Sequence, residues 1–129
     1  MAVKIRTELT TAVPDAPGQL SRVLRLLSKA GVNLLGFHAF VIGAGTSEVR
    51  LVPDNGPKAS AILEKEGYEV ATTEVVTMVG PSGKGEGAKL LHRLEGLNLE
   101  YTWATTSGAG KSLVVIKAPD PKAVVKALT

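Results

Sequence analysis

The hydrophobic pattern of the chain changes period within its first third. Apolar and polar residues alternate over residues 3–13, which is typical of a half-buried strand whose apolar positions are Val3, Ile5, Leu9 and Val13. From residue 20 the apolar positions recur at helical spacing, at Leu20, Val23, Leu24 and Leu27. Between the two patterns, Asp15 is a preferred helix-capping residue and Pro17 suits a first helical turn. Gly31 supplies the left-handed backbone that ends such a helix.

The next residues predict a hairpin, a second helix and another extended segment. Residues 32–42 are apolar on both faces, and Gly43-Ala44-Gly45 predicts a turn into a returning strand over residues 47–53. Residues 54–57 open a second helix that ends at Gly67, and residues 68–79 are rich in residues that favour strands. The order β-α-β-β-α-β is the ferredoxin-like arrangement.

The second half of the chain repeats the first at a nearly constant offset. Residues 43–47 (GAGTS) return as residues 108–112 (GAGKS), and residues 31–34 (GVNL) return as residues 96–99 (GLNL). The second copy predicts strands over residues 73–79, 97–105 and 112–118, with helices over residues 85–94 and 121–128. We expect the extended run of residues 68–79 to end the first copy and to continue into the first strand of the second.

The repeat predicts an α+β fold of two ferredoxin-like βαββαβ modules in tandem. We place the first module at residues 1–72 and the second at residues 73–129, where the pattern βαββα lacks its last strand. A unit of about 60–70 residues buries only roughly 60% of its unfolded-chain surface, so each module is expected to pack on a neighbour. The strand over residues 32–42, apolar on both faces, predicts a homodimer.

Composition excludes several classes of partner. The formal net charge is only +3 and aromatic residues make up 4% of the chain, so neither a basic stripe nor a base-stacking platform for nucleic acid is present. The chain has no cysteine, which fits a reducing compartment. The first residues are typical of a strand rather than of a signal peptide, and the apolar stretches are too short to span a bilayer. We expect a cytoplasmic protein without membrane partners.

The turn before the first predicted helix resembles that of the ACT domain. Residues 13–20 (VPDAPGQL) contain the Asp-x-Pro-Gly turn of that family, and residues 30–34 (AGVNL) its Gly-aliphatic-Asn-aliphatic lead into the second strand. The resemblance implies a regulatory protein without catalytic activity or cofactor, which binds an amino acid or a related small carboxylate between modules. It implies that the ligand-binding residues are Asp15, Ala16, Pro17, Gly18, Gln19, Leu20, Val32, Asn33 and Leu34.

The chemistry of these residues suits such a ligand, although each also has a structural interpretation. A helix N-terminus offers unpaired N–H groups to a carboxylate, and Gly18 lets the backbone approach without a Cβ. The amide of Asn33 both donates and accepts hydrogen bonds. Alternatively, Asp15 is a helix cap, Pro17 and Gly18 form an ordinary loop, and Asn33 bonds nearby backbone.

The two copies differ most at this turn. Residues 80–87 (GPSGKGEG) replace the Asp-x-Pro-Gly turn with a glycine-rich segment, although Asn98 still matches Asn33. Either the second copy has lost its ligand and serves as a structural partner, or its loop closes over a ligand held by the first copy. A ligand-free interaction module, or a regulatory subunit of a partner enzyme, is the alternative function.

Other motifs predict no further chemistry. Residues 105–112 (TTSGAGKS) end like a phosphate-binding loop, but Thr105 replaces the required glycine and a strand follows Ser112, which indicates a hairpin turn. His38 and His92 are the only histidines, and their spacing predicts no metal site.

Overall fold

The computed structural model describes residues 2–106 and 109–129 and divides into two compact units. The first unit is Thr7–Thr73, and the second combines residues 74–129 with residues 2–6. The turn predicted at residues 105–112 includes residues 107 and 108, which lie outside the described residues. In chain order the elements are β1 (Ala2–Pro14), α1 (Gln19–Lys29), β2 (Leu34–Gly43), β3 (Thr46–Pro53), α2 (Gly56–Lys65), β4 (Val70–Pro81), α3 (Glu86–His92), β5 (Tyr101–Thr106), β6 (Lys111–Lys117) and α4 (Pro121–Leu128).

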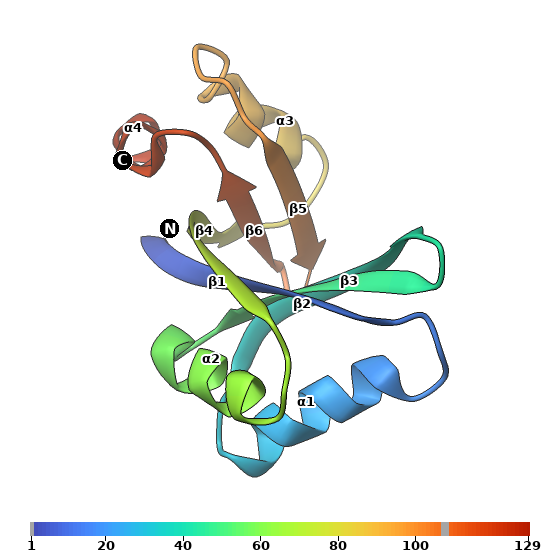
Figure 1. Ribbon diagram of the computed structural model, residues 1–129. Helices are drawn as coiled ribbons and strands as arrows, with labels where there is room; N and C mark the ends of the chain where they lie inside the picture. Colours follow the sequence, from blue (N-terminus) through green and yellow to red (C-terminus); the bar gives the residue numbers. More distant parts are fainter. Residues whose placement is uncertain (1, 107–108) are drawn as a thin grey trace. The chain divides into compact units, whose positions relative to one another are not determined.

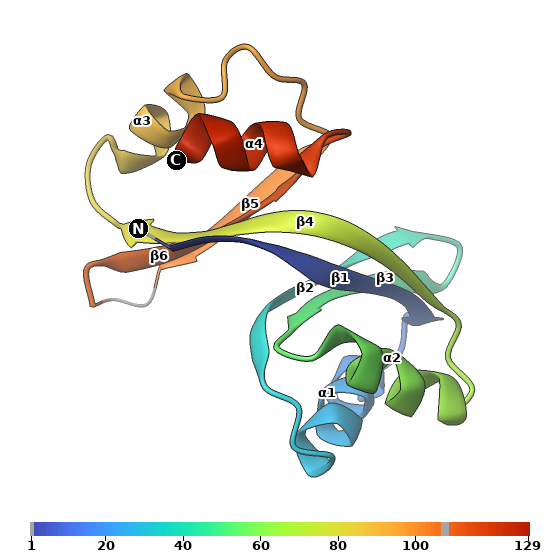
Figure 2. The same ribbon diagram turned by 90° about the vertical axis from the view of Figure 1, so that its left-hand side faces the viewer.

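The first unit has the strand order β2-β3-β1-β4, with α1 and α2 on one face of the strands (Figures 1 and 2). Strands β1 and β3 are antiparallel, as are β2 and β3. The apolar face of β1 and the inner faces of the two helices bury a continuous core. Its fully buried members include Leu9, Val23, Leu27, Leu51 and Leu63. The amphipathic spacing of α1 therefore positions this helix as the sequence predicts.

The second unit has the strand order β1-β4-β6-β5, with α3 and α4 on one face of β4, β5 and β6 (Figure 2). Residues 2–6 of β1 lie in this unit. The hydroxyl of Thr77 donates to the carbonyl of Lys4 at 3.5 Å, and Val3 packs against the core formed by Val76, Ile116 and their neighbours. As the sequence predicts, the second copy runs βαββα and no strand follows α4 among the described residues. Residues 2–6 from the start of the chain occupy the place of its last strand.

The long strands β1 and β4 each contribute to both units. Leu9 of β1 belongs to the first core, whereas Val3 packs against the second. Likewise Val70 of β4 packs against the first core, and Val76 lies in the second. The extended run from the first copy into the second is thus confirmed. Compact packing divides the chain differently from the expected 1–72 and 73–129, because residues 2–6 pack in the second unit.

Several element boundaries differ from the sequence prediction, most clearly those of α1, α3 and β5. Helix α1 begins at Gln19 because Gly18, with φ 84°, has a left-handed backbone that cannot be helical. Pro17 therefore precedes the helix instead of occupying its first turn. Helix α3 ends at His92 and β5 begins only at Tyr101, since turns over the intervening residues replace the predicted helix end and strand start.

Candidate functional site

The loop between β1 and α1 is fixed by backbone hydrogen bonds. The amide of Asp15 donates to the carbonyl of Gly45 in the β2–β3 turn at 2.8 Å, and the amide of Ala16 donates to Pro14 at 2.9 Å. Gly18 then turns the chain into α1 with φ 84° and ψ −8°. The loop is therefore held against the hairpin by main-chain contacts, and its side chains remain available for other partners.

The N-terminus of α1 has free main-chain donors. The residue at the cap is Gly18, so within the described part of the chain no side chain caps the helix. Across the same residues, the amides of Leu20 and Ser21 have no hydrogen-bond acceptor, and the first turn contains no acidic residue. Asp15 lies three residues before the cap and does not fill it. Unpaired N–H groups at a helix N-terminus, with the positive end of the helix dipole, favour an anionic group.

A pocket of about 210 Å³ lies beside this helix start in the first unit. Four residues that the family resemblance singles out line it: Asp15, Ala16, Gln19 and Leu20. The strands supply the rest of the lining, namely Val13 and Pro14 of β1, Ala39, Phe40 and Val41 of β2, and Ser47 and Val49 of β3. Val13 and Val49 are buried, whereas Asp15 and Ala16 are exposed at the rim. The pocket thus has an apolar wall and a polar edge.

The structure places the other expected ligand-binding residues elsewhere. Pro17 and Gly18 lie exposed in the loop and do not line the pocket. Val32 is buried in the core, and Leu34 packs against that core. Asn33 directly precedes β2 and is joined to the β3–α2 loop by two hydrogen bonds. Its backbone amide donates to the Asp54 carboxylate at 3.2 Å, and its carbonyl accepts from the Asp54 amide at 2.9 Å.

Asn33 and the pocket lie at opposite ends of β2. The strand runs from Leu34, paired with Pro53, to Gly43, paired with Thr46. The eight residue-to-residue steps from Asn33 to Val41 span about 26 Å of extended chain. Within one first unit, the Asp15 loop and Asn33 therefore do not meet.

The strand residues that line the pocket were not among the sequence candidates. Their places follow from strand register: Val41 pairs with Ser47, which also pairs with Val13 at the end of β1. The short turn at Gly43-Ala44-Gly45 is the sequence signal that fixes this register, because a tight turn sets which residues of a hairpin face each other. The sequence predicts this turn, whereas the place of the strand residues at the pocket follows only from the three-dimensional strand pairing.

A group of charged residues lies on the strands of the first unit. Glu8 is completely buried, although the alternating pattern places it on the polar face of β1. The Arg50 guanidinium lies 3.5 Å from the Glu8 carboxylate and 2.8 Å from that of Glu48. Burial lowers the pKa of the neighbouring His38, an effect partly opposed by the charge of Glu8. This cluster stabilises a charge inside the fold and does not line the pocket.

The β4–α3 loop of the second unit repeats the geometry of the β1–α1 loop. The amide of Ser82 donates to Gly110 at 2.9 Å, as Asp15 does to Gly45. Gly85 precedes α3 with φ 77° and ψ −2°. The glycine-rich sequence therefore forms the same turn as the Asp-x-Pro-Gly sequence of the first unit.

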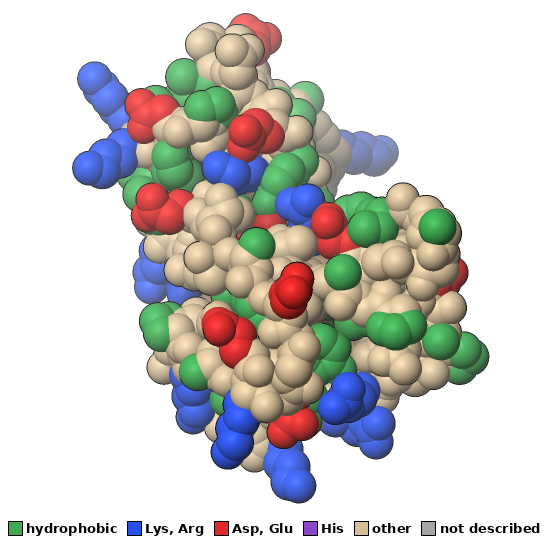
Figure 3. All heavy atoms as spheres, viewed as in Figure 1, with side chains coloured by type: hydrophobic (Ala, Val, Ile, Leu, Met, Phe, Trp, Pro, Cys, Tyr) green, Lys and Arg blue, Asp and Glu red, His purple; other side chains and the backbone are tan. Residues whose placement is uncertain are grey.

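Two further classes of site find no support in the described residues. Over residues 2–106 and 109–129, no three side chains of His, Asp or Glu gather as a set of metal ligands. In the same ranges no helix has both the length and the apolar character needed to cross a membrane. On the face shown in Figure 3, Lys and Arg side chains stand among Asp and Glu side chains and form no continuous stripe.

Comparison with known proteins relates the first unit to one family. The model of the ACT domain matches residues 7–66. No curated protein sequence matches the chain significantly. The fold is similar to that of a protein from Bacteroides thetaiotaomicron, with 23% identity over 98% of this chain and 88% of that chain and a TM-score of 0.85.

Two other solved structures are similar along nearly their whole length. The regulatory subunit of aspartate kinase from Thermus thermophilus has 22% identity and a TM-score of 0.72, with 99% of this chain and 95% of that chain covered. The regulatory subunit of aspartate kinase from Thermus flavus has 22% identity and a TM-score of 0.61, with 98% and 93% covered. At these identities the likeness shows the shared α+β fold.

Proposed function

We propose that the protein is a non-catalytic regulatory protein that binds an amino acid or a related small carboxylate in the first unit. The observation that carries the proposal is the uncapped start of α1 beside a pocket with an apolar wall. The match of residues 7–66 to the ACT domain and the fold shared with regulatory subunits of aspartate kinase support it.

The geometry suits a zwitterion with a small apolar side chain. The free amides of Leu20 and Ser21 are placed to donate to the ligand carboxylate. The exposed Asp15 carboxylate at the rim is a partner for the ligand ammonium group. Val13 and Val49 offer an apolar surface for the side chain. A volume of about 210 Å³ is enough for one amino acid.

We further propose that β2 joins two copies into a homodimer and completes the site. Strand β2 is at the edge of the first unit, where its outer backbone groups favour pairing with another strand. It exposes four large apolar side chains, those of Phe37, Phe40, Val41 and Ile42. Hydrophobic side chains stand exposed over the β2–β3 hairpin at the right of Figure 3.

In the proposed dimer, two-fold pairing of β2 lets the Asp-x-Pro-Gly turn of one copy and the segment around Asn33 of the other contact the same ligand. Antiparallel pairing of identical strands brings the start of one β2 beside the end of the other. Asn33 of one copy then approaches the pocket beside Val41 of the second copy, which a single copy does not allow. We also propose that the second unit is a diverged ACT module, so that the chain is a tandem pair. Binding of the ligand in the first unit is then transmitted to a partner enzyme.

The test of ligand binding is a thermal-shift panel with each of the twenty amino acids. A ligand that binds only the native state raises the melting temperature according to its concentration and Kd. We expect one or a few small amino acids to raise it, and the Asp15→Asn variant, which keeps the size of the side chain, to respond less. A flat panel would instead favour the second candidate function, a ligand-free interaction module that uses the apolar β2 edge.

A further inference from the structure

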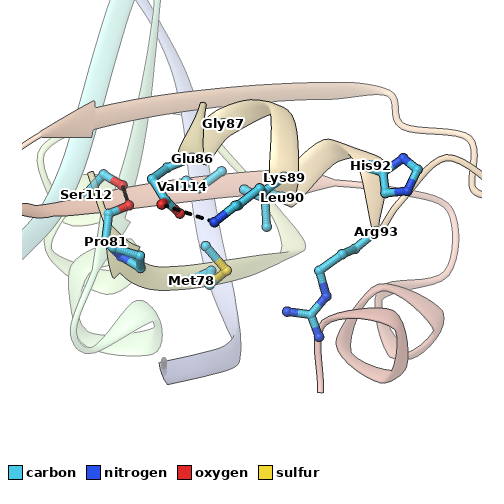
Figure 4. Close-up of a pocket in the computed structure, with 10 residues that line it drawn as sticks. All are labelled: Met78, Pro81, Glu86, Gly87, Lys89, Leu90, His92, Arg93, Ser112 and Val114. Atoms are coloured by element: carbon cyan, nitrogen blue, oxygen red, sulfur yellow. Dashed lines mark hydrogen bonds and ion pairs between the residues drawn. The ribbon is translucent and has the colours of Figure 1, made fainter. Parts of the chain in front are cut away.

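A second and larger pocket lies wholly within the second unit. It has a volume of about 390 Å³ and is bounded by α3, β4 and β6 (Figure 4). Its apolar floor consists of the buried side chains of Met78, Leu90 and Val114. Pockets of this size with an apolar lining and a few polar groups are typical of sites for small molecules.

Charged side chains on α3 and at its C-terminal end form the rim of this pocket. The Lys89 ammonium group lies 3.8 Å from the Glu86 carboxylate, the pair drawn with a dashed line in Figure 4. Arg93 also lines the pocket, and its guanidinium extends away from His92 and apart from that pair. Among the described residues, no side chain pairs with the Arg93 guanidinium. The rim therefore carries two permanent cations against one carboxylate.

In the repeat this pocket corresponds to the pocket of the first unit, and the residues at its rim differ between the two units. The matching loops align α3 with α1, so that Lys89 corresponds to Arg22 and Gly87 to Leu20. In the first unit Tyr68 covers Arg22: its hydroxyl accepts a hydrogen bond of 3.0 Å, and the guanidinium lies 5.3 Å from the ring centre. Lys89 has no such cover among the described residues, and Gly87 contributes no side chain where α1 has Leu20.

We propose that this pocket binds a small monocarboxylate with a compact apolar body, independently of the site in the first unit. The apolar body lies against Met78, Leu90 and Val114, and the carboxylate accepts hydrogen bonds from Arg93 at the rim. Arginine presents paired donors that match the two oxygens of a carboxylate. The excess positive charge of the rim disfavours a ligand that carries only an ammonium group.

The test is a titration of the full chain with ketoleucine, followed by NMR of methyl-labelled protein. The expected result is a shift of the methyl signals of Met78, Leu90 and Val114, with weaker binding at high salt. Isobutyl methyl ketone, which keeps the apolar body and lacks the carboxylate, is expected to bind at least about tenfold more weakly. Shifts at Val13 and Leu20 instead of these methyl groups would overturn the proposal and assign the ligand to the first unit.

Two variants test the charged rim and the space next to α3 separately. Arg93→Gln removes the exposed cation and is expected to weaken ketoleucine binding about tenfold, whereas Lys122→Gln on α4, which does not line the pocket, leaves it unchanged. Gly87 lines the pocket with open space around it, so Gly87→Leu is expected to narrow the pocket and weaken binding while the far-UV spectrum is retained. Equal affinity of the Arg93→Gln variant and the parent would contradict the assignment.

Leucine in the same titration identifies the natural class of ligand. It has the apolar body and carboxylate of ketoleucine and adds an ammonium group. Tighter binding of leucine assigns the ammonium to the Glu86 carboxylate and supports a site for amino acids, whereas tighter binding of ketoleucine supports a site for oxo acids. If neither compound shifts the methyl signals at millimolar concentration, the pocket is no carboxylate site.

Discussion

Gly18 and Gly85 hold the same backbone conformation at the same place in the two units. Each directly precedes a helix, with φ 84° and ψ −8° at Gly18 and φ 77° and ψ −2° at Gly85. A Cβ added at either position would meet no atom within 4 Å, so the backbone angle and not steric crowding requires glycine. The two units therefore share the geometry of this turn, although the residues around the two glycines differ.

This shared conformation predicts that the same substitution at Gly18 and at Gly85 lowers the stability of the protein by the same amount. Gly18→Ala and Gly85→Ala each place a Cβ on a left-handed backbone, which costs about 1 kcal/mol in the free energy of unfolding. Gly87→Ala, at a helical glycine with open space around it, is expected to stabilise the protein slightly because alanine favours the helix. Urea unfolding followed by far-UV circular dichroism measures the three variants. A cost at Gly87 as large as at Gly18 would contradict the role of the backbone angle.

Two substitutions at Gly18 distinguish the effect of a negative charge from the effect of side-chain size at the proposed ligand site. Aspartate and asparagine both tolerate left-handed backbone and have nearly the same size. Gly18→Asp adds a negative charge beside the free amides of α1, so it is expected to weaken binding of an amino acid found in the thermal-shift panel at least about tenfold. Gly18→Asn serves as the matched control and is expected to lose less affinity. Calorimetric titration measures both, and equal losses would show that the charge is irrelevant.

The buried Glu8 carboxylate predicts a strong dependence on Arg50. Arg50→Met removes a positive charge 3.5 Å from a completely buried carboxylate and is expected to cost about 3 kcal/mol. Arg22→Met removes a comparable pair with Glu66 that is about half exposed, and is expected to cost about 1 kcal/mol or less. Adding Glu8→Gln to Arg50→Met should recover part of the loss. Full additivity of the two changes in urea unfolding would contradict a direct interaction.

His38 predicts a loss of stability on mild acidification. Burial lowers the pKa of His38 in the folded protein below its usual value of about 6.5, so the unfolded chain binds the proton more readily. The stability contributed by neutral His38 is present above the unfolded pKa and is lost as the pH falls toward the folded pKa. His38→Gln is expected to reduce the slope of unfolding free energy between about pH 7 and pH 5. His92→Gln is the control on an exposed histidine, and identical slopes for parent and His38→Gln would refute the assignment.

The β2 edge predicts self-association that a single charge disrupts. Phe37→Lys places a charge on an exposed position of β2 and is expected to shift the protein toward the monomer. Leu91→Lys makes the same change at a similarly exposed position of α3, and association should persist. Sedimentation velocity at several concentrations distinguishes the two. A parent protein that is monomeric at all concentrations would rule out the proposed dimer.

Local sequence signals were sufficient for most elements of the fold. The helical spacing that ends at Leu27, the stop at Gly31 and the turn at Gly43-Ala44-Gly45 are all properties of short segments, and the structure confirms the elements they predict. The use of residues 2–6 as the last strand of the second unit was missed because strand pairing is non-local. A period-two pattern predicts which face of a strand is buried, but it does not predict whether that face packs in the core of the first unit or in that of the second.

The candidate site was predictable only in part for the same reason. Asp15, Ala16, Gln19 and Leu20 are close in sequence, so one motif locates them together. The opposite wall depends on the pairing of Val41 with Ser47, which no motif states. The burial of Glu8 likewise escaped the pattern, because alternation assigns charged residues to the solvent face.

The central claim, that the free amides of α1 bind a small amino acid, is tested most directly by NMR. The full chain labelled with nitrogen-15 is titrated with each of the twenty amino acids. At least one is predicted to move the amide signals of Leu20 and Ser21 in a saturable manner, with smaller changes along β2. If every amino acid left these two signals in place up to millimolar concentration, the claim would be contradicted.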